Sequence, residues 1–77
     1  MINIQDIIPF MKKGWVAMDG NCKWAWYDKK PTIDKEFLQW LPDDNDGIYE
    51  MLDSAFDIVP ADDWTKSLIQ VKGVKTR

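Results

Sequence analysis

The chain lacks histidine altogether and contains one cysteine, Cys22, among its 77 residues. The absence of histidine removes the commonest general base, the commonest metal ligand and every Ser–His or Cys–His nucleophile pair. A single cysteine rules out an internal disulfide and, with the missing histidine, a structural zinc site of the usual kind. We therefore expect a protein that is not an enzyme and that holds no catalytic residues, no metal and no cofactor.

Long apolar segments are missing as well. No stretch of the sequence approaches the ~20 apolar residues of a transmembrane helix, and no N-terminal run has the length of a signal peptide's apolar core. We expect a cytoplasmic protein. Its length suits a single domain over 1–77, in which the polar residues 72–77 form a frayed tail.

Lys and Arg are absent from the segment 43–63, although the formal net charge of the whole chain is only −3. The acidic residues of this segment are Asp43, Asp44, Asp46, Glu50, Asp53, Asp57, Asp62 and Asp63. Their layout argues against phosphate as a partner, and it fits either a basic partner or a solvated acidic surface. When Gly47 is placed at the invariant glycine of an EF-hand loop, Pro42 falls where the first ligand belongs. We therefore expect a solvated turn here and no metal site.

Aromatic residues, by contrast, are abundant, with five Trp, three Phe and two Tyr. The stretch 14–27 is typical of two strands joined by a two-residue turn, at 19–20 or at 20–21. Side chains alternate along a strand, so both turns place the same tryptophans on one face of the hairpin: Trp15, Trp24 and Trp26. We expect these rings to form one cluster, because a small domain needs its tryptophans for its core.

The rest of the chain predicts short elements around this hairpin. Hydrophobic spacing predicts an amphipathic helix over 3–12 that Pro9 shortens or kinks, and further helical segments over 48–56 and 61–69. The run 37–41 fits a strand or a helix, and we favour a third strand because a two-stranded ribbon alone is marginal in water. The predicted fold is α+β, with a small twisted antiparallel sheet packed by short helices.

An alternative function follows from the aromatic residues of the hairpin. Trp24, Trp26 and Tyr27 stand close in sequence to a set of lysines, namely Lys23, Lys29 and Lys30. Aromatic rings beside positive charge are the ingredients of a single-stranded nucleic-acid site, and they also suit a small-ligand site. The acidic balance of the chain and the need for a core favour a structural role for these rings.

Three tryptophan-containing segments carry a resemblance: KKGWVAMD at 12–19, WxWYxxKP at 24–31 and DWTKSLI at 63–69. Together they resemble short uncharacterised proteins encoded by phages and prophages. The resemblance spans most of the chain and brings no catalytic residues. It implies a protein that acts by binding, and some small acidic proteins of this kind block host defence enzymes, including CRISPR effectors.

Charge and resemblance together suggest an inhibitor that occupies a basic surface of a host protein, such as a nuclease that binds nucleic acid, in the host cytoplasm. Acidic residues would steer the partner, and an exposed aromatic side chain would slow its dissociation. The candidate partner-binding residues are Asp43, Asp44, Asp46, Asp62, Asp63, Trp40 and Tyr49. Direct contact with nucleic acid or a membrane is not expected, and the oligomeric state stays open.

The acidic balance generates a first prediction. The protein should bind neither DNA nor RNA with useful affinity, because the chain is acidic and its segment 43–63 has no Lys or Arg to pair with a phosphate. Fluorescence anisotropy of labelled oligonucleotides at low and high salt measures this directly. Micromolar binding that weakens with salt would contradict the prediction and favour the stacking alternative.

Overall fold

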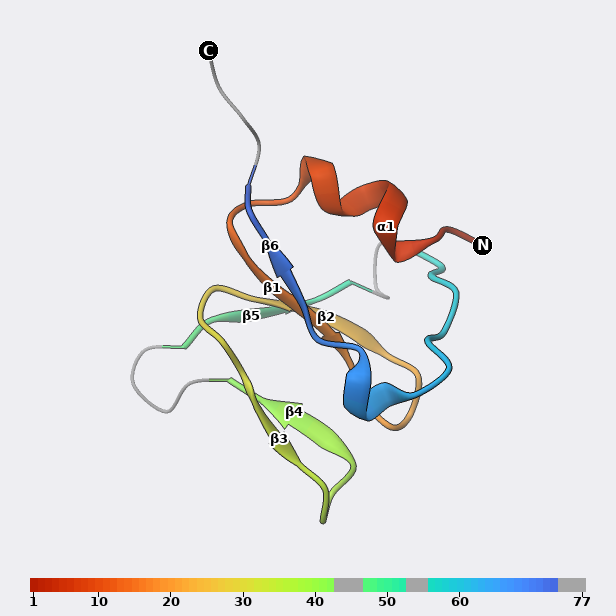
Figure 1. Cartoon of the computed structure of the whole chain (residues 1–77), viewed down its shortest axis with the longest axis vertical. Helices are drawn as coiled ribbons and strands as arrows, with labels where there is room; N and C mark the ends of the chain where they lie inside the picture. The colour runs from red at the N-terminus through yellow and green to blue at the C-terminus, as the bar shows by residue number, and fades with distance from the viewer. Residues whose placement is uncertain (43–46, 53–55, 74–77) are drawn as a thin grey trace.

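A computed structural model describes residues 1–42, 47–52 and 56–73. Its main sheet has four antiparallel strands in the order β5-β2-β1-β6 (Figure 1). These strands are β1 (Gly14–Met18), β2 (Trp24–Tyr27), β5 (Tyr49–Met51) and β6 (Ile69–Val71). A second, two-stranded sheet pairs β3 (Thr32–Asp34) with β4 (Gln39–Leu41). The helical elements are α1 (Ile4–Ile7) and the 3-10 turns η1 (Ile8–Phe10) and η2 (Trp64–Lys66).

The predicted α+β class is confirmed by this arrangement. Among the described residues, no helix has the length and apolar character needed to cross a membrane.

The predicted hairpin over 14–27 forms, but its loop is longer than either two-residue turn. The amide of Cys22 donates to the Asp19 carbonyl at 2.9 Å, and the Asp19 amide donates to the Lys23 carbonyl at 2.9 Å. Cys22 has a left-handed φ of 68°. This is the geometry of a three-residue loop whose last residue is left-handed, and it pairs Met18 with Trp24.

The longer loop overturns the expectation of one tryptophan face. A turn at 20–21 would pair Trp15 with Trp26. The longer loop instead pairs Trp15 with Tyr27, one residue further along the chain. Because side chains alternate with a period of two, this shift of one places Trp15 on the opposite face from Trp24 and Trp26. The prediction that the three rings share one cluster is therefore wrong.

Each face of the main sheet consequently has its own apolar core. On one face, the buried side chains Val16, Met18, Trp24 and Trp26 cluster with Ile4, Ile58 and Val71. On the other, Ala17, Ala25 and Tyr27 cluster with Trp40 of β4, and Trp15, Trp64 and Leu68 pack against them. The first core lies under the α1–η1 segment and the second against the β3–β4 hairpin and η2.

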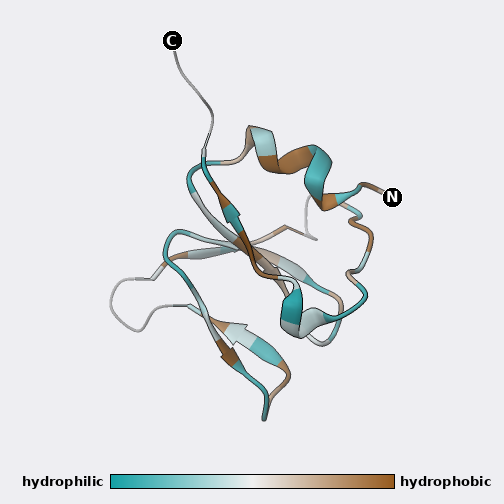
Figure 2. Ribbon diagram, in the orientation of Figure 1, coloured by the Kyte–Doolittle hydropathy of each residue, from teal (hydrophilic) through white to brown (hydrophobic). Residues whose placement is uncertain are grey.

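The N-terminal helix is as short as its proline predicts. The Asn3 side chain caps α1 by accepting the Gln5 amide at 3.0 Å, and Pro9 stands where α1 gives way to the tighter η1. Hydrophobic and hydrophilic residues alternate along this segment (Figure 2). Ile4 is buried, while Ile7 and Ile8 pack against the first core.

The helix predicted over 48–56 is wrong in its described part, because Tyr49–Met51 forms strand β5. A fully buried strand must satisfy the backbone groups on both of its edges. On the edge of β2 away from β1, the backbone amide of Asp28 donates to the Ile48 carbonyl at 3.0 Å. The backbone amide of Leu52 donates to the Trp24 carbonyl at the same distance. Residues 53–55 of the predicted helix lie outside the described residues.

Two other predictions hold in part. Within 37–41, Gln39–Leu41 is a strand as favoured, but it pairs with β3 and not with the hairpin over 14–27. Its turn has Leu38 in a left-handed conformation, with φ 56°. The segment 61–69 contains the 3-10 turn η2 and ends where β6 begins, so its helical character is limited to Trp64–Lys66.

The left-handed cysteine generates a second prediction. An L-residue in this region is destabilised by roughly 1–2 kcal/mol, whereas glycine adopts it freely. Cys22 is exposed, so its side chain contributes little packing. Cys22→Gly should raise the unfolding free energy by about 1 kcal/mol in urea denaturation. Cys22→Ala is the control, because it removes the thiol and keeps the strain, and it should leave stability nearly unchanged. Equal effects of the two changes would refute this account of the loop.

Candidate functional site

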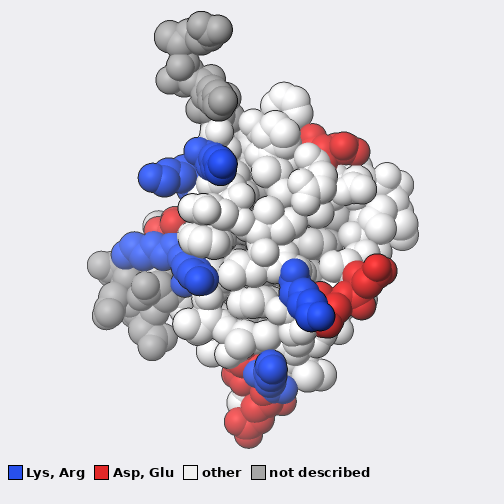
Figure 3. All heavy atoms as spheres, in the orientation of Figure 1, with Lys and Arg blue, Asp and Glu red and all other residues white. Residues whose placement is uncertain are grey.

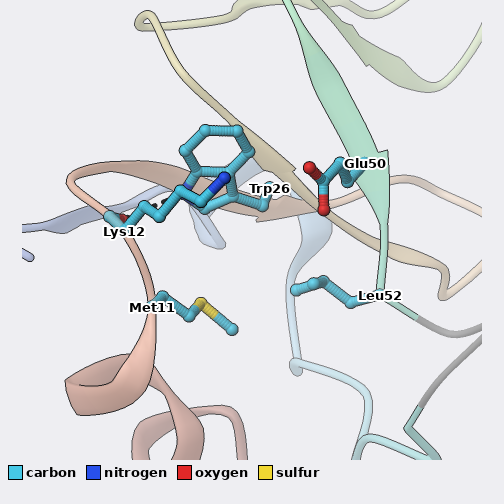
Figure 4. Close-up of a pocket in the computed structure, with 5 residues that line it drawn as sticks. All are labelled: Met11, Lys12, Trp26, Glu50 and Leu52. Carbon is cyan, nitrogen blue, oxygen red and sulfur yellow. Dashed lines mark hydrogen bonds between the residues drawn. The ribbon is translucent and has the colours of Figure 1, made fainter.

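Two hollows in the described part of the surface contrast in character. The smaller one, of about 190 Å³, lies between the end of η1 and strand β5 (Figure 4). Figure 4 shows the Lys12 and Glu50 side chains on either side of the Trp26 ring, with Met11 and Leu52 below. The indole N–H of Trp26 donates to the Lys12 carbonyl at 3.1 Å, so this ring fastens the helical segment to the sheet. Ligand pockets usually exceed ~300 Å³, which makes this hollow a packing seam in our interpretation.

The larger hollow, of about 380 Å³, lies where the β1–β2 loop meets β4 and β5. We call it the Asp19 pocket. Its described lining consists of Asp19, Tyr27, Gln39, Trp40, Leu41, Pro42, Tyr49 and Met51. Asp19 is the one charged side chain of that described lining, and most of the others are apolar or aromatic. Such a mixture of apolar walls and few polar groups is typical of binding sites.

Backbone geometry fixes Asp19 in this position. It follows β1 directly and begins the left-handed loop of the hairpin. Its carboxylate accepts the Trp40 amide at 2.8 Å, which ties the second sheet to the first. Beside it, the Gly20 amide donates to the Leu38 carbonyl at 2.7 Å, and a Cβ at Gly20 would stand 2.9 Å from that oxygen. Glycine is therefore required for the close approach of the two hairpins.

Burial controls the ionisation of the two titratable groups around this contact. It raises the pKa of the Asp19 carboxyl, and the hydrogen bond from the Trp40 amide lowers it by less. Burial, reinforced by the charges of Asp19 and Tyr49, raises the pKa of the Tyr27 hydroxyl. The Tyr27 hydroxyl therefore stays protonated and points at the Trp40 carbonyl, at a long 3.4 Å.

Exposed hydrophobic side chains surround the Asp19 pocket. An adjoining hollow of about 240 Å³ shares Asp19 and Gln39 with it and extends to Phe37 and Leu38. We use the term hairpin surface for the exposed apolar residues that line the two hollows: Phe37, Leu38, Leu41, Tyr49 and Met51. Phe37 is 69% exposed and Tyr49 is 53% exposed. A gathering of large exposed hydrophobic residues is typical of an interaction site.

The two aromatic residues proposed from sequence as exposed anchors behave differently. Trp40 is only 8% exposed, and its indole N–H donates to the Trp64 carbonyl at 3.2 Å. Its expected exposure is therefore wrong, because the second core needs this ring to cover Ala17 and Ala25. Tyr49 is exposed and lines the Asp19 pocket, with its ring centroid 6.2 Å from that of Tyr27.

The acidic residues proposed from sequence are spread over the chain. Asp62 and Asp63 are exposed beside η2 and do not line the Asp19 pocket. The Asp63 carboxylate caps η2, accepting the Thr65 amide at 3.0 Å and the Thr65 hydroxyl at 2.6 Å. These two bonds lower the pKa of Asp63. The other candidates, Asp43, Asp44 and Asp46, lie outside the described residues.

The rings on which the alternative nucleic-acid site depends are buried. Trp24 is 1% exposed, Tyr27 is 2% exposed and Trp26 is 9% exposed, so none offers a free face to a base. The half-buried Trp15 has the Lys30 ammonium 5.6 Å from its ring centroid. A single ring with one lysine is not a platform along which successive bases stack.

Sequence reasoning missed Asp19, Gln39, Phe37 and Leu38 as site residues. The sequence indicates only a turn at Asp19, and no local signal reveals that its carboxylate reaches an amide 21 positions away. The prediction of a strand over 37–41 includes Phe37 and Leu38, whereas these two residues lie in an exposed turn. A hydrophobic pair followed by a polar residue is ambiguous between buried strand and exposed loop.

Comparison of the chain with models of protein families, with curated proteins and with solved structures finds no match. Within the described residues, no group of three or more Cys, Asp or Glu side chains is placed to hold a metal ion. The candidate site consists of the Asp19 pocket and the hairpin surface around it.

Ionisation of Asp19 generates a third prediction. Because its pKa is raised, the folded state binds a proton more tightly than the unfolded state does. The ionised Asp19 carboxylate therefore lowers the free energy of unfolding at neutral pH. This loss of stability disappears as the pH falls through the pKa that Asp19 has in the folded state. Asn keeps an acceptor for the Trp40 amide without the charge. Asp19→Asn should be at least as stable as the wild type at neutral pH, and the difference should shrink in acid.

Thermal unfolding of both proteins across the acidic range measures that difference. Asp63 supplies the opposite control, because its lowered pKa makes Asp63→Asn destabilising at neutral pH. A stability difference for Asp19→Asn that does not change with pH would contradict the assignment of a desolvated carboxylate.

Proposed function

We propose that this chain is a protein-binding module that uses the hairpin surface to occupy a basic and partly apolar surface of another protein. The observation that carries the proposal is the cluster of exposed hydrophobic residues around Asp19. Exposed apolar groups of this size, held on short strands and turns, supply the buried contacts that slow dissociation of a complex.

Charge supports a basic partner. No Lys or Arg occurs anywhere in the segment 36–65, which includes β4, β5 and all five residues of the hairpin surface. In the view of Figure 3, lysines and acidic residues lie mostly around the rim of a broad uncharged face. Lys35, in the turn beside Phe37, is a nearby positive charge, but the five residues of the hairpin surface include no Lys or Arg. On an acidic chain, such a surface favours the approach of a positively charged protein over that of a phosphate.

The nature of the partner follows from the same charges. A protein that normally grips nucleic acid presents a basic surface, and covering that surface would inhibit it. The resemblance to short phage and prophage proteins supports a host protein as the target, such as a nuclease of a defence system. This proposal assigns the protein the role of an inhibitor that acts by occupation and not by chemistry.

The hairpin surface generates a fourth prediction. Phe37→Ser should weaken partner binding by at least about tenfold, because hot-spot aromatic residues contribute ~2 kcal/mol or more. Phe10→Ser is the matched control: Phe10 is 82% exposed, and it lies on η1 at the far end of the molecule from the β3–β4 hairpin (Figure 1). Both changes should leave the fold intact, because both rings are mainly in solvent.

The experiment begins with capture of host proteins on the immobilised wild-type chain and continues with the affinity of each purified partner for the two variants. A partner that depends on Phe37 and tolerates Phe10→Ser supports the proposal. Capture of no protein, or partners that respond equally to both changes, would overturn it.

A further inference from the structure

The Asp19 pocket combines one carboxylate with walls suited to a long side chain. Leu41, Pro42 and Met51 supply aliphatic lining, and the rings of Tyr27 and Tyr49 supply aromatic lining. A side chain with a methylene stem and a cationic head matches such a pocket, because its stem packs on apolar groups while its head seeks charge. Aromatic rings add attraction, because a cation near a ring face interacts with the ring quadrupole.

The carboxylate of Asp19 has spare capacity for such a head. A carboxylate accepts several hydrogen bonds, and within the described part of the chain the Trp40 amide is the one donor recorded for Asp19. No Lys or Arg occurs in the described lining of the pocket. Burial already raises the pKa of this carboxyl, which means that the charge is poorly compensated in the free protein. An incoming cation would supply the missing compensation.

Guanidinium fits this pocket better than ammonium does. Its planar group stacks on aromatic rings, it is more weakly hydrated than an ammonium, and it donates in a fixed fork to oxygen acceptors. The Gln39 side chain also lines the pocket and offers a further acceptor beside Asp19. A volume of about 380 Å³ leaves room for a whole arginine side chain.

We infer that the Asp19 pocket receives an arginine side chain of the protein partner, with Asp19 pairing the guanidinium and Tyr49 contacting its plane. This inference rests on the proposed function and names the group of the partner that the site recognises. Asp19 thereby fixes the register of the complex, while the surrounding hydrophobic residues supply contact area.

The test uses a small probe and needs no partner. Butylguanidinium is titrated into the labelled wild-type protein, and NMR shifts of the Met51 methyl and Trp40 indole signals are followed. Neutral butylurea, which has nearly the same shape, is the matched probe. We expect saturable millimolar binding of butylguanidinium and at least tenfold weaker binding of butylurea, since the two differ by the charge that pairs with Asp19.

Two variants localise the interaction. Asp19→Asn keeps an acceptor for the Trp40 amide and should weaken butylguanidinium at least tenfold. Glu50→Gln removes an exposed charge from the same strand as Tyr49. The Glu50 side chain lies on the opposite face of that strand and lines the smaller hollow beside Lys12 and Trp26. The Glu50→Gln variant should leave binding unchanged. If Asp19→Asn does not fold, acid titration of the wild type replaces it, and affinity should fall as Asp19 protonates.

Equal binding of the two probes, or butylguanidinium shifts confined to the hollow beside Lys12 and Glu50, would overturn the inference. Unchanged affinity in the Asp19→Asn variant, or unchanged affinity on acid titration, would overturn it too. These outcomes are separable from failure of the proposed function, which is measured by the effect of Phe37→Ser on a captured protein. Partner binding without guanidinium binding refutes the arginine pocket alone. Guanidinium binding without any partner refutes the proposed function and leaves only the preference of the pocket for a guanidinium group.

Discussion

The structure depends on the register of its central hairpin, which a left-handed residue at Cys22 sets. A three-residue loop opposes Met18 to Trp24, and this choice decides which side chains face each side of the main sheet. Trp24 and Trp26 then face the N-terminal helix, while Ala17 and Ala25 leave room on the other side for a second sheet. With a register shifted by one residue, the bulky rings would occupy the face where β3 and β4 pack.

Tryptophan has a second use in a chain with so little regular structure. Three indole N–H groups donate to backbone carbonyls that lie outside the two sheets: Trp24 to Val59, Trp26 to Lys12 and Trp40 to Trp64. Each ring therefore supplies apolar area to a core and anchors a loop to it. These indole hydrogen bonds fix connecting segments of a short chain that has no disulfide to do so. This second use accounts for the high number of tryptophans.

The candidate site lies at the junction that these two features create. Asp19 ends the central strand β1, and its carboxylate and the neighbouring Gly20 amide hold the β3–β4 hairpin against the first sheet. A carboxylate is a costly acceptor in this half-buried position, because an amide side chain would accept the Trp40 N–H without a partly desolvated charge. The proposed recognition of a cationic partner rests on this charge and on the exposed Phe37 and Tyr49 beside it.

The sequence by itself determined the α+β class, the hairpin over 14–27 and the short helix that Pro9 limits, because turn residues, proline and hydrophobic spacing act locally. It also determined the charge layout, and it identified Tyr49 as a candidate contact. Only the tertiary structure decided the register and the site around Asp19. A loop one residue longer than expected turns the faces of β2 over relative to those of β1. Strand β5 forms because β2 lacks a partner on that edge, not because of its own hydrophobic pattern. Contacts between distant segments, such as that of Asp19 with Trp40, leave no periodic trace in the sequence.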